Sequence, residues 1–320
     1  MSDLTLFRVS FKLTAPLGTP LNSGTMFGQL CWRKREAEGE AALVAWLTDE
    51  AHVWALSDGF PGGLLPRPLL APQPRSDDPR AADTHKQNKK KQFVTREGFL
   101  KNRNALTPAK LDEHLRGVKE RSATVTHNTI DRRTGSTPEE GGLYFLDEDW
   151  SFSPLVGSHA PNSSFVEAGP SRDVYVEAPR GDETRIKKLF QAMGEAGFGR
   201  DASLGRGLWN EVRVKEDREL AAKPQGKALR YVSLSHGVAD GFVDMRCKLA
   251  AHYGKTGPQV AVADGVTPFK RPLLLAQPGA TFAKANGARP GTIINGVHML
   301  RPEIIHNGLH VAIPYNEVPS

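Results

Sequence analysis

Cysteine is scarce in this chain of 320 residues, and long hydrophobic runs are missing. The two cysteines, Cys31 and Cys247, stand alone and match none of the spacings of zinc sites, so we expect Cys31 to be a buried free thiol. No apolar run approaches the roughly 18 residues that cross a membrane, and residues 1–5 lack the basic start and apolar stretch of a signal peptide. We therefore expect a cytoplasmic protein without a membrane-spanning segment.

The composition is that of a globular protein whose positive charge is unevenly placed. Hydrophobic residues make up 39% and charged residues 24%, and the length suits one large domain or two ordinary ones. Residues 85–133 hold thirteen Lys or Arg against five Asp or Glu, a net +8 in a chain whose total is +6. Such a block is either a solvated face or an electrostatic footprint for phosphates.

The first 150 residues alternate between strand and helix patterns. Residues 6–13 alternate apolar and polar side chains, which predicts a half-buried strand, and a helical pattern starts at Thr25. A second helical stretch covers residues 41–46 and a strand covers 52–56, whereas residues 59–80 are rich in Pro and Gly and indicate an irregular loop.

A β-hairpin with a basic tip is predicted next. Residues 121–130 alternate again, residues 142–146 supply a partner strand, and the polar segment 131–136 forms the turn. Asp131 in this segment is expected to pair with Arg132 or to cap the turn. The tip can therefore project from a sheet without disturbing the core.

The second half repeats the mixture of strands and helices. Weak patterning over residues 151–171 suggests a domain boundary, which divides the chain into residues 1–155 and 156–320. A strand over 173–178, a helix over 184–196, a glycine-rich loop and a strand over 208–214 then form half of a ferredoxin-like βαββαβ unit. The first strand and helix of the chain could open another such unit.

The glycine-rich loop, GFGRDASLGRG at residues 197–207, is the sharpest local signal. Glycine tolerates positive φ and lets a backbone approach a ligand, and exposed N–H groups in such a loop can hold phosphate beside Arg200 or Arg206. The loop matches neither a P-loop nor a dinucleotide fingerprint, because it follows a helix and precedes a strand. A tight helix-to-strand connection packed under the sheet is the alternative.

Several short segments in order along the chain resemble those of RAMP proteins, the RNA-binding ferredoxin-like proteins of CRISPR systems. They are GFGRDASLGRG at 197–207, SGTMFGQLCW at 23–32, HNTIDRRTGST at 127–137 with GGLY at 141–144, FKRP at 269–272 followed by PGATF at 278–282, and Lys86-x-x-Lys89-Lys90 before FVT at 93–95. Together they resemble the Csm subunit of type III-A effectors that binds the 5′ handle of the guide RNA.

This resemblance implies an α+β fold of two ferredoxin-like (RRM-like) units with a projecting β-hairpin. It also implies a non-catalytic scaffold for antiviral defence, without cofactor or metal. Its partners would be the 5′ handle of the guide (CRISPR) RNA, the polymerase-cyclase large subunit and a backbone RAMP subunit. The residues expected to contact RNA are Gly24, Thr25, Lys89, Lys90, His127, Asn128, Arg132, Arg133, Thr134, Gly199, Arg200 and Arg206.

Physical chemistry supplies a reason for each group of these residues. The helix that starts at Thr25 offers N–H groups and a partial positive charge to a phosphate. The hairpin tip offers arginines for phosphate and Asn128 for a base edge. The backbone of the glycine-rich loop would pack against either the hairpin or the RNA.

Two alternatives remain open in the sequence. A RAMP endoribonuclease that processes precursor guide RNA would need a general base, for which His127, His236 and His298 are the candidates. A histidine beside RNA also serves to stack or to form hydrogen bonds, and His236 before Gly237 suits a turn. The other alternative is the Cmr-type counterpart in a type III-B complex.

Overall fold

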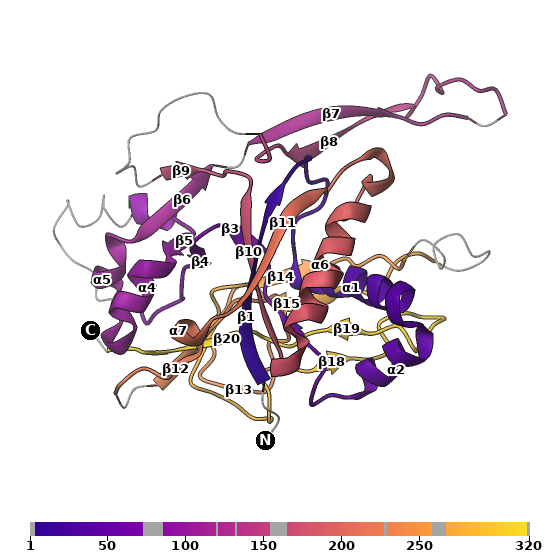
Figure 1. Cartoon of the computed structure of the whole chain (residues 1–320). Coiled ribbons are helices and arrows are strands. Elements are labelled where there is room, and N and C mark those ends of the chain that lie inside the picture. The colour runs from indigo at the N-terminus through magenta and orange to yellow at the C-terminus, as the bar shows by residue number, and fades with distance from the viewer. Residues whose placement is uncertain are drawn as a thin grey trace.

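A central antiparallel sheet organises the computed structural model, which describes residues 4–72, 86–119, 121–131, 133–153, 165–226, 229–257 and 267–318 (Figure 1). Its strands follow the order β11-β1-β10-β2, and β3 also pairs with β10. Their bounds are β1 Leu4–Leu13, β2 Ala55–Leu56, β3 Phe60–Pro61, β10 Ser171–Pro179 and β11 Trp209–Glu216. The central strand β1 is therefore paired on both sides by strands from the second half of the chain.

Helices cover one face of this sheet (Figure 1). They are α1 Ser23–Glu38, α2 Glu40–Thr48 and α6 Glu183–Ala196. Phe11 on β1 packs toward this layer, since its ring lies 4.6 Å from that of Trp209 and 6.4 Å from that of Phe190 on α6. The alternation predicted over residues 6–13 is confirmed, because Phe7, Val9, Phe11 and Leu13 are all buried.

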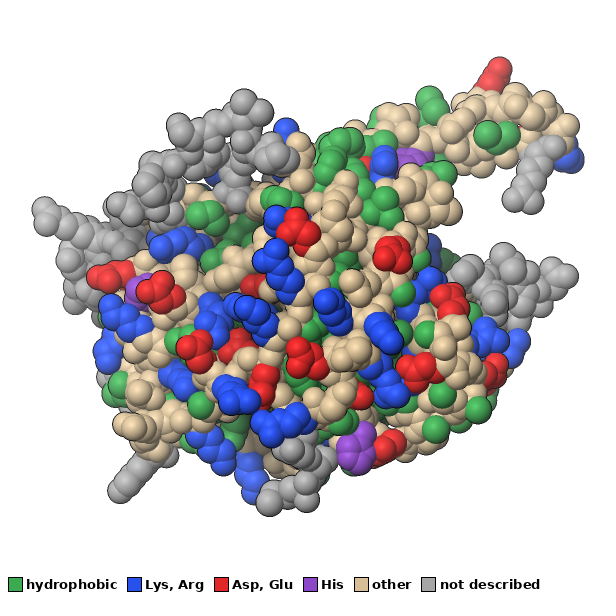
Figure 2. Space-filling view, in the orientation of Figure 1, with side chains coloured by type: hydrophobic (Ala, Val, Ile, Leu, Met, Phe, Trp, Pro, Cys, Tyr) green, Lys and Arg blue, Asp and Glu red, His purple; other side chains and the backbone are tan. Residues whose placement is uncertain are grey.

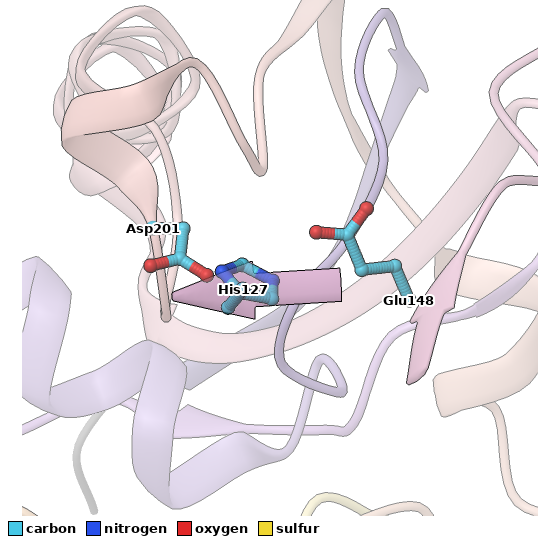
Figure 3. Close-up of side chains that lie close together, drawn as sticks. All are labelled: His127, Glu148 and Asp201. Atoms are coloured by element: carbon cyan, nitrogen blue, oxygen red, sulfur yellow. The ribbon is translucent and has the colours of Figure 1, made fainter. Parts of the chain in front are cut away.

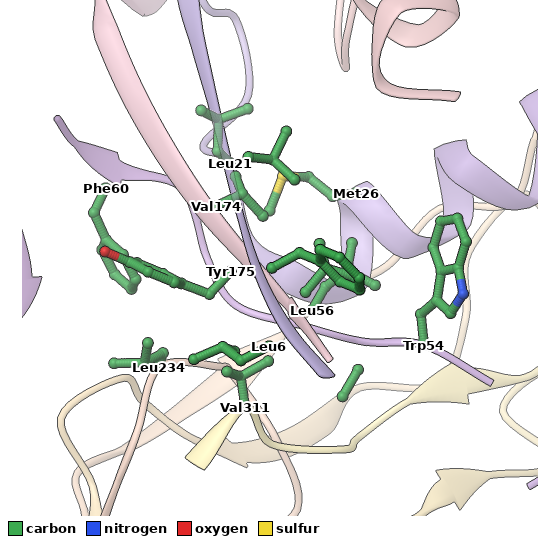
Figure 4. Packing of buried hydrophobic residues seen from close by; sticks show 14 of the residues in the cluster. Leu6, Leu21, Met26, Trp54, Leu56, Phe60, Val174, Tyr175, Leu234 and Val311 are labelled. Atoms are coloured by element: carbon green, nitrogen blue, oxygen red, sulfur yellow. The ribbon is translucent and has the colours of Figure 1, made fainter. Parts of the chain in front are cut away.

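The C-terminal strands cover the opposite face. β12 Leu229–Ser233 lies between β16 Thr281–Phe282 and β20 Ala312–Asn316. Figure 4 shows Leu6 of β1 close to Leu234 and Val311 from this region. All three belong to the same buried cluster as the helix-facing residues, so the sheet is sandwiched within one continuous hydrophobic core.

A long insertion between β3 and β10 carries a second sheet and the hairpin. The sheet has the order β4-β5-β6-β9, formed by Leu64–Pro66, Phe93–Thr95, Leu115–Lys119 and Phe165–Glu167. Two short helices, α4 Arg96–Asn102 and α5 Pro108–Asp112, pack beside it. The hairpin consists of β7 Ser122–Asn128 and β8 Leu143–Asp149, and Figure 1 shows it extending from the body.

The remaining strands form two-stranded pairs near the C-terminus, after the short helix α7 Arg218–Ala221. They are β13 Phe242–Val243 with β17 Lys284–Ala285, β14 Leu249–His252 with β15 Leu273–Ala276, and β18 Ile293–Ile294 with β19 His306–Asn307. No helix in the described part of the chain is long and apolar enough to span a membrane.

The structure corrects three expectations about organisation. The Pro- and Gly-rich stretch 59–80 is not wholly irregular, since it contains β3 and β4. The sheet crosses the expected boundary at 155/156, because β10 and β11 pair with β1 and so belong with the N-terminal strand. Within the described residues 229–257 and 267–318 only strands are found, so a complete second βαββαβ pattern is missing from those ranges.

Candidate functional site

A large groove runs beneath the base of the hairpin. Its volume is about 1620 Å³, and its walls come from distant segments that include residues 17–22, 66–72 and 147–149. Its basic lining residues are Arg67, Lys86, Lys89, Lys91, Arg172 and Lys248. Its acidic lining residues are Asp58, Asp112, Asp147, Glu148 and Asp149. Because both basic and acidic side chains line its walls, the groove is not a uniformly positive channel.

The basic block of the sequence separates into two parts. Lys86 and Lys89 are exposed and line the groove together with the half-buried Lys91, whereas Lys90 is exposed but is not among the lining residues. Arg96 instead holds the fold together, since it lies 2.7 Å from Asp217 and 2.8 Å from Glu219. Part of the block is therefore structural, and the lysines that line the groove are the candidates for contact with phosphates.

The hairpin is a two-stranded ribbon whose register runs from Ser122 opposite Asp149 to Asn128 opposite Leu143. At the tip, Asp131 Oδ1 accepts a hydrogen bond from the backbone N–H of Arg133 at 2.9 Å, so capping of the turn by Asp131 is confirmed. The Arg133 side chain is 92% exposed, and its Nε lies 3.8 Å from Asp131 Oδ1. Such an exposed pair contributes little to stability, which leaves this guanidinium available to a ligand.

The other tip residues are also at the surface. Asn128 Nδ2 donates to Thr137 Oγ1 at 3.2 Å, and the hydroxyls of Thr134 and Ser136 lie 2.9 Å apart. Arg132 lies outside the described residues. The tip is therefore polar, as expected, and it presents Asn128, Arg133 and Thr134 at the surface. Their hydrogen bonds are exposed and weak, so contacts with RNA could replace them.

Sequence reasoning missed the apolar surface of the hairpin. Ile130, Leu143, Tyr144 and Phe145 have exposed fractions of 58%, 62%, 42% and 66%. On the face drawn in Figure 2, hydrophobic side chains lie along the projecting hairpin, while Lys and Arg are interspersed with Asp and Glu over the body. The signal was present in Leu143-Tyr144-Phe145, because consecutive apolar residues point to opposite faces of a two-stranded ribbon, so that both faces carry apolar side chains.

The glycine-rich loop packs under the base of the hairpin. Gly197, Gly199, Gly205 and Gly207 all have positive φ. The guanidinium of Arg200 donates to the carbonyl of Asp147 at 3.0 Å, and Arg206 Nε donates to Glu148 Oε1 at 2.8 Å. Both arginines of this loop, which were expected to contact RNA, thus tie the loop to β8. The loop therefore packs against the hairpin, which is one of the two partners expected for it.

The start of α1 does not offer the expected anion site. Asp58 Oδ1 accepts a hydrogen bond from the Ser23 N–H at 2.9 Å, so a carboxylate already lies at the positive end of the helix. His306 fills the space that a side chain at Gly24 would need, which explains glycine there by packing. Thr25 follows within the same first turn. A phosphate at this position would be repelled by Asp58.

A histidine–aspartate pair on the groove wall was also missed. His236 Nδ1 lies 2.6 Å from Asp58 Oδ2, and both residues line the groove. Burial alone would lower the pKa of His236, but the hydrogen bond and the charge of Asp58 outweigh it and raise that pKa above its ordinary value. No local pattern could have joined residues 58 and 236, because their contact depends on how the C-terminal strands cover the sheet.

His127 lies at the junction of the hairpin and the loop. Its ring stacks on that of Tyr144 at 5.3 Å, and one atom each of His127, Glu148 and Asp201 lie within 4.8 Å of one another (Figure 3). His298 is buried, and its Nε2 lies 2.8 Å from the carbonyl oxygen of Thr267. The three candidate histidines therefore have different partners and do not form one cluster.

No protein-family model matches the sequence, and no curated protein sequence matches it. Solved structures do match its fold along the whole length. A chain of a Csm1–Csm4 cassette in complex with cA4 is 15% identical, with a TM-score of 0.61, and covers 98% of this chain and 99% of its own. A chain of the same kind of cassette in complex with cA3 is 14% identical, with a TM-score of 0.59 and 99% coverage of both.

A third match has a different partner. A chain of a Csm3–Csm4 subcomplex from the type III-A CRISPR-Cas interference complex is 13% identical, with a TM-score of 0.54, and covers 98% of this chain and 99% of its own. Csm4 is the component common to the three assemblies. This chain therefore shares its fold with the matched chains over 98% of its length or more, and the resemblance seen in the sequence is confirmed at the level of fold.

Proposed function

We propose that this chain is an RNA-binding scaffold subunit of a type III-A CRISPR effector. The proposal rests on one observation above all, the full-length fold likeness to a component of both Csm1–Csm4 and Csm3–Csm4 assemblies. The projecting hairpin, with an exposed arginine and exposed aromatic side chains, supplies what a single-stranded RNA needs, which is charge for phosphates and surfaces for stacked bases. In this role the chain binds the 5′ handle of the guide RNA.

The partners follow from the same likeness. One surface of the chain would contact a large subunit comparable to Csm1, and another a backbone subunit comparable to Csm3. We further propose that the sheet β11-β1-β10-β2 with α1 and α6 is a ferredoxin-like unit, since its elements follow the order βαββαβ. The C-terminal strands would be a second unit that has diverged, and a cytoplasmic location suits the whole complex.

The test is purification of the tagged chain from its host under one salt condition. We expect co-purification of guide RNAs that share one repeat-derived 5′ end, together with a cyclase-type large subunit and a backbone RAMP subunit. Sequencing of the RNA and mass spectrometry of the proteins check this. A preparation with RNA of random ends, or with no second subunit, contradicts the proposal.

A processing endoribonuclease is the second candidate, and the His236–Asp58 pair is the observation that favours it. A histidine oriented by a carboxylate on the wall of a groove is a plausible general base. We nevertheless expect no site-specific cleavage of repeat RNA by the isolated chain. Cleavage that disappears in His236→Ala or His127→Ala, but persists in the exposed control His52→Ala, would replace the scaffold with the enzyme.

A further inference from the structure

Three side chains from separate elements converge at the base of the hairpin. His127 comes from β7, Glu148 from β8, and Asp201 from the glycine-rich loop. One nitrogen or oxygen of each lies within 4.8 Å of the others. Figure 3 shows the imidazole ring between the two carboxylates. Groups arranged in this way around a common point can share one ion.

Each of these side chains has a buried atom without a hydrogen-bond partner among the residues that the structure describes. These atoms are His127 Nε2, Glu148 Oε2 and Asp201 Oδ2. The Glu148 side chain is completely buried, with an exposed fraction of 0%. A buried carboxylate oxygen without a partner is energetically costly, because it has given up its hydrogen bonds to water. The described residues therefore leave a demand for a further partner to these three atoms.

Two arginines orient the carboxylates without removing that demand. Arg206 Nε binds Glu148 Oε1 at 2.8 Å, which leaves Oε2 as the unpartnered oxygen. Arg200 Nε lies 3.4 Å from Asp201 Oδ2, but the two atoms are not aligned for a hydrogen bond. Groups outside the ligand set commonly orient metal ligands in this way. Their positive charge also predicts a moderate rather than a very tight affinity for a cation.

We propose that His127, Glu148 and Asp201 form a site for a divalent transition-metal ion that clamps the hairpin to the glycine-rich loop. One imidazole and two carboxylates suit Zn²⁺ or Mn²⁺, whereas Mg²⁺ and Ca²⁺ prefer oxygen ligands alone. Because the three ligands come from both strands of the hairpin and from the loop, the ion fixes the angle at which the hairpin leaves the body. His127 is then a ligand rather than an RNA contact. This site is independent of the proposed function.

The test uses the full-length chain, freed of metal by a chelator and purified without a histidine tag. Zn²⁺ is titrated by calorimetry, and Co²⁺ is titrated by its visible absorption spectrum. We expect one ion per chain, and at least a tenfold loss of affinity in each of His127→Ala, Glu148→Gln and Asp201→Asn. Asp147→Asn is the matched control, because this neighbouring carboxylate on β8 lies outside the cluster, and it should bind like the parent.

Hydrogen exchange gives a second measurement, which distinguishes a metal ion that joins the hairpin to the glycine-rich loop from adventitious metal binding elsewhere. Zn²⁺ should slow exchange at the base of the hairpin and in residues 197–207 in the parent and in Asp147→Asn, but not in Asp201→Asn. Asn tolerates the left-handed backbone of residue 201, whose φ is 58°, so this variant should fold even if Glu148→Gln does not. Absence of binding in the parent, or equal binding in all variants, overturns the proposal.

Discussion

Gly205 and Gly207 stand two residues apart in the same loop and have φ values of 81° and 68°. Their surroundings differ, because a Cβ at Gly205 meets nothing within 4 Å whereas one at Gly207 overlaps the backbone of Phe198. We expect Gly205→Ala to lower the free energy of unfolding by about 1–2 kcal/mol through backbone strain alone. Gly207→Ala should lose about 1–3 kcal/mol more through overpacking. Urea unfolding measures both, and equal losses contradict the packing argument.

Buried histidines make stability depend on pH. Burial, followed by the charge of Lys270 and nearby histidines, lowers the pKa of His306 to about 3. In the unfolded chain this histidine titrates near 6.5, so below that pH the unfolded state binds a proton that the folded state refuses. Stability is therefore lost as the pH falls from about 6.5, at about 1.4 kcal/mol per pH unit for this residue.

We expect His306→Gln to remove that share of the slope between pH 6.5 and 5. The measurement is urea unfolding at several pH values, with His52→Gln, an exposed histidine, as the control. His310, whose pKa burial lowers to about 4, should keep a similar slope in both variants. A parent and a His306→Gln variant with parallel pH profiles would show that His306 is not buried as described.

At the scale of elements, the sequence predicts what is local and misses what is paired at a distance. The hairpin follows from alternation and a polar turn, and β7 and β8 lie where the pattern placed them. The boundary at 155/156 failed because nothing near residue 171 shows that β10 pairs with β1. The cluster of His127, Glu148 and Asp201 was hidden for the same reason, since its ligands meet only after the loop packs under the ribbon.

The hairpin should act as a clamp on RNA. Because the Arg133 side chain is 92% exposed, Arg132→Ala with Arg133→Ala should leave the fold intact. Retention of handle RNA should weaken by roughly 1–3 kcal/mol for each lost charge-assisted contact. Binding is compared at one salt concentration, with RNAs that carry or lack the handle. Arg218→Ala, which removes a 77% exposed arginine of the body, is the control. A double variant that binds like the parent removes the hairpin from the interface.

The lysines beside the groove offer a matched comparison. Lys86, Lys89 and Lys91 line the groove, and Lys90 does not. If the groove follows the RNA backbone, changing these three to Gln should reduce the slope of log K against log salt by about 2, since each phosphate contact on a single strand contributes about 0.7. Lys90→Gln should change it by less than one contact. A slope that depends only on the number of lysines removed assigns this segment to nonspecific attraction.

At the scale of the whole molecule, the sandwiched sheet makes distant parts of the chain depend on one another. Leu6 belongs to β1, whereas Leu234 and Val311 come from the C-terminal region, and all three lie in one buried cluster. Asn307 also donates a hydrogen bond to the carbonyl of Trp54 at 2.8 Å, which ties β19 to the segment before β2. Removing either cover would expose the face of the sheet that it contacts and so weaken the core that both covers share.

We therefore expect one cooperative unfolding transition rather than separate transitions for two domains. Val311→Ala, at a side chain with an exposed fraction of 0%, should destabilise peptides of β1 and of the C-terminal strands equally, by about 1–3 kcal/mol. Hydrogen exchange as a function of urea, resolved by peptide, measures this. Val243→Ala, at a C-terminal side chain that is 49% exposed, is the control and should change little. If Val311→Ala lowers the stability only of peptides beyond residue 229, while peptides of β1 keep their protection from hydrogen exchange, the C-terminal strands fold independently of the central sheet.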